Sequence, residues 1–304
     1  MQIERRSGLS VEEFRREYQA PHLPVILTDA ADGWGALNWT PDFFRERFED
    51  KDIKVDGDTP RKMGAFIGEV MSSTEERPAP YLRNVDIPTD FPELVPDVTP
   101  VFDHARPDRI RNPLFPSHFP QEAHFMDLFI GGPGSGFPHL HYDVHHLFSW
   151  LVQIYGKKRF FLYPPDQSPY MYPNPEVPDE SLIENPVHPD YDRWPLFEKA
   201  KPIEITLHAG EALFFPCHWW HVTWMEEPNI TIGFDQLTTA NWRDFMGDQF
   251  ARRRDRPLKA GAVLGYLMAT GLGLSLYERV TGKHDDPVDL DFFGQVRDAV
   301  RFQL

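Results

Sequence analysis

Short strand-like segments, each closed by glycine or proline, fill the chain from Phe125 to Gln236. The breaks fall at 131–134, which reads Gly-Gly-Pro-Gly, at the proline pair 164–165 and at Gly210. Several short strands separated by turn signals are typical of an antiparallel sandwich or barrel of the jelly-roll type. We therefore predict a mainly β fold, with strands over 125–130, 139–144, 149–154, 158–163, 203–207, 212–215, 219–225 and 229–236.

The regions on either side have helical patterns. Ser10 and Glu13 form a capping box that predicts a helix over 11–18, and Thr40 before Pro41 starts another. We also expect strands over 24–27 and 53–55, a helix over 63–71, a long proline-rich loop over 84–122 and a substrate-facing insert over 166–201. This pattern predicts N-terminal α/β elements packed on the barrel (1–80), a catalytic barrel core (81–240) and a C-terminal helical segment (241–304).

The formal charge of −16 bears on the choice of partner. Nucleic acid and anionic membranes are themselves polyanions and need a basic surface, so we expect neither as a partner. The single cysteine, Cys217, excludes an internal disulfide, and Met1–Arg6 is not an apolar leader. We therefore expect a cytoplasmic protein.

One uncharged run, residues 260–277, has the length of a membrane-spanning helix. Four glycines dilute it, and Thr270 and Ser275 interrupt it. A transmembrane role stays open, but we favour a buried or dimer-forming helix pair in which small residues permit close approach. The chain is accordingly predicted to be a homodimer.

The candidate metal ligands are His141, Asp143 and His221. Side chains two apart on a strand point to the same face, so His141 and Asp143 would converge. A second histidine from a distant strand, His221, completes two imidazoles and one carboxylate. This set occupies one face of an octahedral ion and leaves open positions, as in non-haem Fe(II) oxygenases.

Two nearby residues compete as ligands. His139 shares the face of His141, and we place it outside the ligand set. Cys217 lies four residues before His221, a spacing that would suit two ligands on one helix. Pro216 and the neighbouring aromatic residues favour a strand, so we interpret Cys217 as a small buried apolar residue.

Longer motifs around these residues resemble the JmjC, or cupin-like, hydroxylases. The resemblance is carried by His141-Tyr142-Asp143, by Gln153-Ile154-Tyr155-Gly156-Lys157-Lys158 and by Trp219-Trp220-His221. It covers about residues 10–240 and is nearest to the subgroup of the hypoxia-response asparaginyl hydroxylase. It implies a double-stranded β-helix that holds Fe(II) on His141, Asp143 and His221, with 2-oxoglutarate as co-substrate.

The resemblance also implies contacts to 2-oxoglutarate. Its basic residue for the distal carboxylate falls on Lys158 and its tyrosine contact on Tyr81. The pattern agrees, because Lys158 shares one strand face with Phe160 and Leu162, and a buried ammonium needs an anionic partner. A solvated turn over 157–159 is the alternative. Ser149 and Asp235 stand where the family often has asparagine, and we predict that both also contact the co-substrate. Pro138 stands in place of a threonine.

Together these features predict an Fe(II)- and 2-oxoglutarate-dependent oxygenase. It would use O2 to hydroxylate a C–H bond of a protein, peptide or small-molecule substrate. The alternatives are a cupin metalloenzyme that does not use 2-oxoglutarate and a non-catalytic binding module with the same fold. The intact set of three ligands favours the enzyme.

Overall fold

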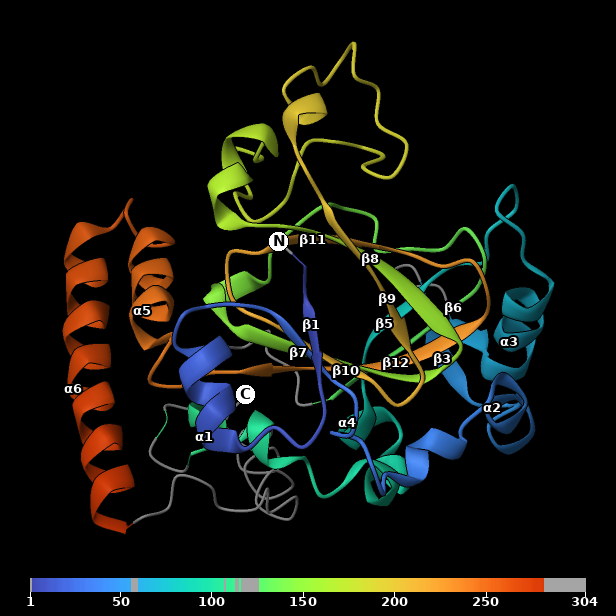
Figure 1. The fold of residues 1–304 in the computed structure, drawn as a ribbon, viewed down its shortest axis with the longest axis horizontal. Helices are drawn as coiled ribbons and strands as arrows, with labels where there is room; N and C mark the ends of the chain where they lie inside the picture. The colour runs from blue at the N-terminus through green and yellow to red at the C-terminus, as the bar shows by residue number, and fades with distance from the viewer. Residues whose placement is uncertain (1, 56–59, 107, 113–114, 116–125, 282–304) are drawn as a thin grey trace.

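The structure is a computed structural model, and it describes residues 2–55, 60–106, 108–112, 115 and 126–281 (Figure 1). The last part of the predicted C-terminal segment, 282–304, and Phe125 of the first predicted barrel strand lie outside the described residues.

Twelve strands are named in the described part of the chain. They are β1 (Glu4–Arg6), β2 (Val25–Leu27), β3 (Asp52–Lys54), β4 (Pro60–Lys62), β5 (Leu82–Asp86), β6 (Asp127–Gly131), β7 (Phe148–Tyr155), β8 (Lys157–Tyr163), β9 (Ile203–His208), β10 (Ala212–Phe215), β11 (Trp220–Trp224) and β12 (Asn229–Gln236). Their order is β1-β2-β10-β7-β12-β6-β5 in a major sheet and β11-β8-β9 in a minor sheet, with β3-β4 as a separate hairpin.

The helices flank these sheets. They are α1 (Val11–Phe14), α2 (Pro41–Arg47), α3 (Met63–Ser72), α4 (Ile87–Asp90), α5 (Trp242–Ala251) and α6 (Pro257–Thr281). Shorter helical turns are η1 (Arg15–Gln19), η2 (Gly35–Asn38), η3 (Pro92–Val98), η4 (Asp103–Ala105), η5 (Arg109–Arg111), η6 (Val144–His146), η7 (Pro165–Tyr170) and η8 (Phe197–Lys199).

The prediction of a mainly β core with a C-terminal helical segment is confirmed. The N-terminal segment joins it directly, because β2 pairs with β10 and β1 pairs with β2 in the major sheet. The largest apolar cluster continues through both parts, from Phe14 and Phe44 to Trp150 and Phe214. The capping box at Ser10 is present, and the helix it starts widens after Phe14 into the π-helical turn η1.

The predicted strand over 139–144 is wrong. Only His141 makes β bridges there, to His221 and to Glu180, and a 3-10 turn begins at Val144. Backbone hydrogen bonds nonetheless hold the segment on both sides. Tyr142 donates to the carbonyl of Asp179 at 3.0 Å, and Ser181 donates to the carbonyl of Leu140 at 2.8 Å. The fourth strand position of the minor sheet is thus reduced to a short bridged segment.

Residues 107, 113–114 and 116–122 of the predicted loop over 84–122 lie outside the described residues, and the described part contains more regular structure than a loop. Strand β5 and helix α4 occupy its beginning, and 3-10 turns follow them. Proline explains the difference, because Pro88 and Pro92 stand in the first turns of short helices, where a missing N–H costs nothing.

A single glycine permits the tight turn that leads from the major sheet into the minor sheet. Gly156 joins β7 to β8 with φ +67°, a conformation that other residues rarely adopt. A Cβ atom there would lie 2.3 Å from the carbonyl oxygen of Pro228. The tight turn after Tyr155 therefore requires glycine, and it directs Lys158, Phe160 and Leu162 to the buried face of β8.

The C-terminal helices form a pair at one side of the molecule (Figure 1). Leu267 and Leu274 of α6 are fully buried against Trp242 and Phe245 of α5. Gly271 permits this approach, since a Cβ atom there would lie 2.4 Å from Nε1 of Trp242. Arg109 adds a buried ion pair to Glu278, with Nη2 at 2.8 Å from Oε2.

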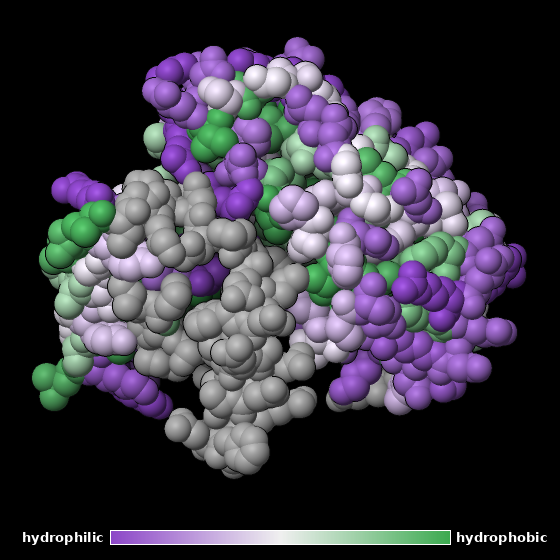
Figure 2. All heavy atoms as spheres, turned by 90° about the horizontal axis from the view of Figure 1, so that it is seen from below, coloured by the Kyte–Doolittle hydropathy of each residue, from purple (hydrophilic) through white to green (hydrophobic). Residues whose placement is uncertain are grey.

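The opposite side of α6 is apolar and exposed. Leu258, Leu272, Leu276 and Val280 are 91%, 74%, 63% and 75% exposed. Figure 2 shows hydrophobic residues along the edge of the molecule that α6 forms. By length and composition, Pro257–Val280 is the one helix in the described residues that could cross a membrane.

Candidate metal and co-substrate site

The two candidate histidine ligands are paired through their backbones. His141 donates to the carbonyl of His221 at 3.1 Å, and His221 donates to the carbonyl of His141 at 2.7 Å. Directly opposed residues of such a pair project their side chains to the same face. The two imidazole centroids accordingly lie 4.2 Å apart.

Asp143 reaches the same point. Its Oδ1 lies 3.8 Å from Nε2 of His141 and 3.8 Å from Nε2 of His221. The other carboxylate oxygen, Oδ2, accepts a short hydrogen bond from Ser149 Oγ. Ser149 therefore fixes the direction of the Asp143 carboxylate.

Hydrogen bonds to backbone carbonyls define which ring nitrogen of each histidine is free. Nδ1 of His141 lies 3.0 Å from the carbonyl of His139, and Nδ1 of His221 lies 3.1 Å from the carbonyl of Trp219. A carbonyl only accepts, so Nδ1 carries the hydrogen in both rings. Both unprotonated Nε2 atoms then face Asp143, which is the tautomer that metal ligation requires.

The spacing and charge of the three groups fit a divalent ion. Neighbouring octahedral ligands with bonds of about 2.1 Å lie about 3 Å apart, so 3.8 Å closes with small side-chain movements. Burial, followed by electrostatic repulsion between the two imidazoles when both are protonated, lowers the pKa of His141 well below its ordinary value. His141 is therefore neutral near pH 7, as a ligand must be.

Lys158 lies inside the barrel, which excludes the solvated turn as an alternative. Its side chain is 1% exposed, and Nζ donates to the hydroxyl of Tyr81 at 2.9 Å. The aromatic rings of Tyr81 and Phe129 lie 5.4 Å and 5.5 Å from Nζ. Among the described residues, no carboxylate forms an ion pair with Lys158. Burial accordingly lowers the pKa of Lys158 to about 7.

Strand register explains why Lys158 and the ligands share one space. His221 on β11 lies opposite Leu162 on β8, and opposed residues share a face of the sheet. Lys158 is four residues from Leu162 on the same strand and therefore projects to that face as well. His221 and Lys158 both line a cavity of about 720 Å³ between the two sheets.

This cavity contains all seven predicted site residues: Tyr81, His141, Asp143, Ser149, Lys158, His221 and Asp235. Asp235 lies opposite Ser149 in the β12–β7 register, with Oδ1 at 3.4 Å from Ser149 Oγ. His139 also lines the cavity, whereas Cys217 does not.

Several residues at this cavity were not anticipated from the sequence. Arg83 stacks on Phe137, with its Cζ 4.9 Å from the ring centroid. Arg252, at the end of α5, donates to Asp179 of the 166–201 insert at 3.0 Å. Val177, Asp179 and Glu180 of that insert line the cavity, and its contact with a substrate stays a prediction. No local sequence pattern indicated that Arg252 lies at the cavity, since it follows an ordinary amphipathic helix.

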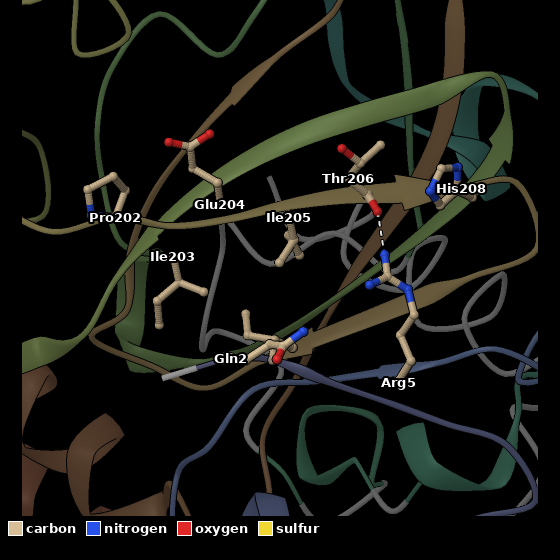
Figure 3. Close-up of a pocket in the computed structure, with 9 residues that line it drawn as sticks. Gln2, Arg5, Pro202, Ile203, Glu204, Ile205, Thr206 and His208 are labelled. Carbon is tan, nitrogen blue, oxygen red and sulfur yellow. Dashed lines mark hydrogen bonds between the residues drawn. The ribbon is translucent and has the colours of Figure 1, made fainter.

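A second pocket, of about 460 Å³, lies on the outside of the barrel between β1 and β9 (Figure 3). Arg5 crosses it and donates to the carbonyl of Thr206 at 2.6 Å and to Glu211 at 2.8 Å. The guanidinium thereby connects the edges of the two sheets, so its hydrogen bonds are used within the fold.

Comparison with known proteins identifies the family that this chain resembles. Residues 11–234 match the family profile described as a cupin-like domain. The chain is 31% identical over 245 residues to arginine-specific demethylase JMJ22 of Arabidopsis thaliana, covering 79% of this chain and 47% of the relative. It is 26% identical over 261 residues to tRNA wybutosine-synthesizing protein 5 of Gallus gallus, covering 76% of each.

A third relative is the bifunctional arginine demethylase and lysyl-hydroxylase psr-1 of Caenorhabditis elegans, 26% identical over 246 residues, with 77% of this chain and 60% of the relative covered. The chain thus spans about half the length of the first plant relative and a quarter of lysine-specific demethylase JMJ21 of the same plant. Assignment to the asparaginyl hydroxylase subgroup stays a prediction.

Proposed function

The chain belongs to the cupin-like domain family, and from this premise we propose that it is an Fe(II)- and 2-oxoglutarate-dependent oxygenase. His141, Asp143 and His221 would hold the iron, and Lys158 with Tyr81 would hold the distal carboxylate of 2-oxoglutarate. When bound, iron and 2-oxoglutarate activate O2 to oxidise a C–H bond, with release of succinate and CO2.

The observation that carries the proposal is the burial of Lys158 beside Tyr81 in the cavity of the three ligands. An isolated ammonium in an apolar strand face is costly, and folding alone gives no reason to keep it there. A dicarboxylate with one end at the metal ligands would supply the missing anion. The hydroxyl of Tyr81 would then add a hydrogen bond to the same carboxylate.

The chain's own residues perform the remaining tasks. Backbone pairing holds His141 against His221, and Ser149 holds Asp143, so the ligand geometry is formed before any ion arrives. The walls formed by Phe129, Phe137 and Phe215 limit water around the reacting groups. The 166–201 insert and Arg252 form another part of the cavity wall, where a substrate would contact the protein.

The cavity lining also bears on the substrate. Besides Asp143, it contains the carboxylates of Asp127, Asp179, Glu180 and Asp235, which outnumber the cations Arg83, Lys158 and Arg252. Together with the overall charge of −16, this favours a neutral or cationic group over an anionic one. Demethylation or hydroxylation of a basic side chain, as the names of two relatives state for those proteins, fits this lining better than a tRNA substrate.

The test uses the purified full chain under anaerobic conditions with Fe(II) and 2-oxoglutarate. Chelation of the iron by the keto acid should give a visible charge-transfer absorption, and admission of O2 should then produce succinate. Asp143→Ala should give neither signal. His139→Ala is the matched control, because the ring of His139 is not used as a ligand, and it should retain both.

The same experiment separates the alternatives. Iron binding without the charge-transfer absorption and without succinate would identify a cupin metalloenzyme that does not use 2-oxoglutarate. Failure of wild-type protein to bind iron at all would leave a binding module and overturn the proposal.

A further inference from the structure

A second set of metal-binding side chains lies outside the cavity described above. Within the described part of the chain, one donor atom from each of His22, Cys217 and Asp244 lies within 4.8 Å of the others. His22 follows η1, Cys217 precedes β11, and Asp244 is in the first turn of α5. None of the three lines the cavity of His141, Asp143 and His221.

The tautomer of His22 suits a ligand. Nε2 of His22 lies 3.4 Å from the carbonyl of Ala240, which can only accept a hydrogen bond. The hydrogen is therefore on Nε2, and the lone pair of Nδ1 faces the sulfur of Cys217 at 3.9 Å. The carbonyl thus orients His22 as carbonyls orient the two histidines of the first site.

The spacing fits a tetrahedral ion. With a metal–sulfur bond of about 2.3 Å and a metal–nitrogen bond of about 2.05 Å, the two donor atoms lie about 3.6 Å apart. The sulfur and Nδ1 of His22 are 3.9 Å apart before any ion has drawn them together. Cys217 is 2% exposed, whereas His22 and Asp244 are partly exposed, which leaves a path of entry.

Two further histidines border the set. Nε2 of His218 lies 3.6 Å from Oδ1 of Asp244, and the ring of His146 lies 4.0 Å from that of His218. The neighbouring His218 imidazole lowers the pKa of Asp244, which keeps this carboxylate ionised. The backbone has positive φ at His22 (57°), His146 (53°) and His218 (66°), so the fold tolerates conformational strain at this corner.

We propose that His22, Cys217 and Asp244 form a second metal site for a divalent ion of the zinc class. A thiolate, an imidazole and a carboxylate select zinc or cobalt over magnesium, calcium and manganese. Three protein ligands leave a fourth position for water or for His218. The ion would join the N-terminal segment and α5 to the turn that precedes β11. Since His221 is four residues after Cys217, the second site would also steady the segment that carries a ligand of the first.

Cobalt(II) distinguishes the two sites by its spectrum. Sulfur-to-cobalt charge transfer gives near-ultraviolet absorption, and Cys217 is the one cysteine of the 304 residues. Titration of the full chain with Co(II) should develop this absorption with one equivalent at saturation. His141→Ala, which damages only the first site, should retain it. Cys217→Ser should lose it and bind one equivalent fewer, with unchanged circular dichroism.

A second variant tests the site independently in case Cys217→Ser does not fold. Asp244→Asn keeps the sulfur and should weaken Co(II) binding at least tenfold in the same titration. Wild-type protein that binds Co(II) without sulfur absorption would overturn the second site. So would unchanged stoichiometry in Cys217→Ser or unchanged affinity in Asp244→Asn. These results are independent of the first site, because His141, Asp143 and His221 include no sulfur.

Discussion

His141 and His221 are 80 positions apart in the chain, and each donates its backbone N–H to the carbonyl of the other. This reciprocal pair makes the separation of the two imidazoles a property of the backbone. The spacing of the two candidate ligands is therefore set by the backbone pairing between β11 and the 140–143 segment.

Loss of a ligand should abolish iron binding at this pair. We expect His141→Ala and Asp143→Ala to show no stoichiometric Fe(II) binding by anaerobic calorimetry. Asp143→Glu should be impaired as well, since one added methylene displaces the carboxylate beyond the distances that a metal accepts. His139→Ala should bind normally. Full binding by both alanine variants would refute the assignment.

When no co-substrate is bound, Lys158 should lower the free energy of unfolding of the protein. Replacing it by methionine, which fills a similar volume, removes a buried and unpaired charge and should raise the free energy of unfolding by on the order of 1–4 kcal/mol. Urea denaturation near pH 6 measures this. Lys157→Met, at an exposed position in an ion pair with Glu227, is the matched control and should change little. Destabilisation by Lys158→Met would mean that the ammonium has an internal partner.

The pH dependence of that difference has a definite sign. The pKa of Lys158 falls from an ordinary 10.5 to about 7 on folding. Between these values the unfolded chain binds more protons than the folded one, so stability rises with pH. The advantage of Lys158→Met should therefore shrink as pH rises from 7 to 9. A difference that is constant over this range would contradict the lowered pKa.

Co-substrate affinity should fall as the pH rises, whereas the stability of the wild-type protein should rise. A dicarboxylate binds the protonated Lys158, so its dissociation constant should increase by about tenfold per unit above pH 7. Calorimetry with the Mn(II)-loaded protein and N-oxalylglycine measures this without turnover. Lys158→Arg stays charged and should show a flatter profile at whatever affinity it retains. A wild-type profile that is flat up to pH 9 would assign the carboxylate to another cation.

The exposed side of α6 is predicted to form a homodimer. Leu272 and Leu276 are largely exposed on it, and apolar patches of this kind mark interaction surfaces. Light scattering should give twice the 35.4 kDa chain mass. Leu272→Glu should yield monomers that keep their fold. A wild-type chain that is monomeric at micromolar concentration contradicts the prediction, and recovery only in detergent would support a membrane role.

Leu267 needs a different interpretation from Leu272. It is fully buried against α5, so Leu267→Arg should break the pairing of the two helices in the monomer. We expect a loss of stability of about 3 kcal/mol or more, because the guanidinium would be buried without a partner. Thermal denaturation measures it, and Leu276→Arg on the exposed side should cause little change.

The sequence predicted most of the barrel strands because strands depend on short-range patterns. The three candidate ligands do meet in the structure, but the strand alternation that paired His141 with Asp143 does not exist there. Alternation placed Lys158, Phe160 and Leu162 on one face, and Gly156 marked the turn before them. The strand expected over 139–144 failed for a related reason. Two hydrogen-bonding partners from distant segments, His221 and Glu180, replace a regular ladder there, and no local pattern encodes them.

Side-chain contacts between distant segments could likewise not be predicted from the sequence. Ser149 was expected to touch the co-substrate, and the structure places its hydroxyl on Asp143. The neighbours of Cys217 come from residues 22 and 244, more than 190 positions and 27 positions away. Cys217 was correctly expected to be buried, but burial alone did not indicate which groups would face its sulfur.

Two main-chain hydrogen bonds attach the 166–201 insert to the His141 segment, from Tyr142 to the carbonyl of Asp179 and from Ser181 to the carbonyl of Leu140. Such bonds do not depend on which side chains the insert carries. Mutations at exposed positions such as Val177 can therefore accumulate in descendants of this gene without disturbing the ligands. The wall of the cavity that the insert forms can thus change in its side chains while the backbone that positions His141 stays the same.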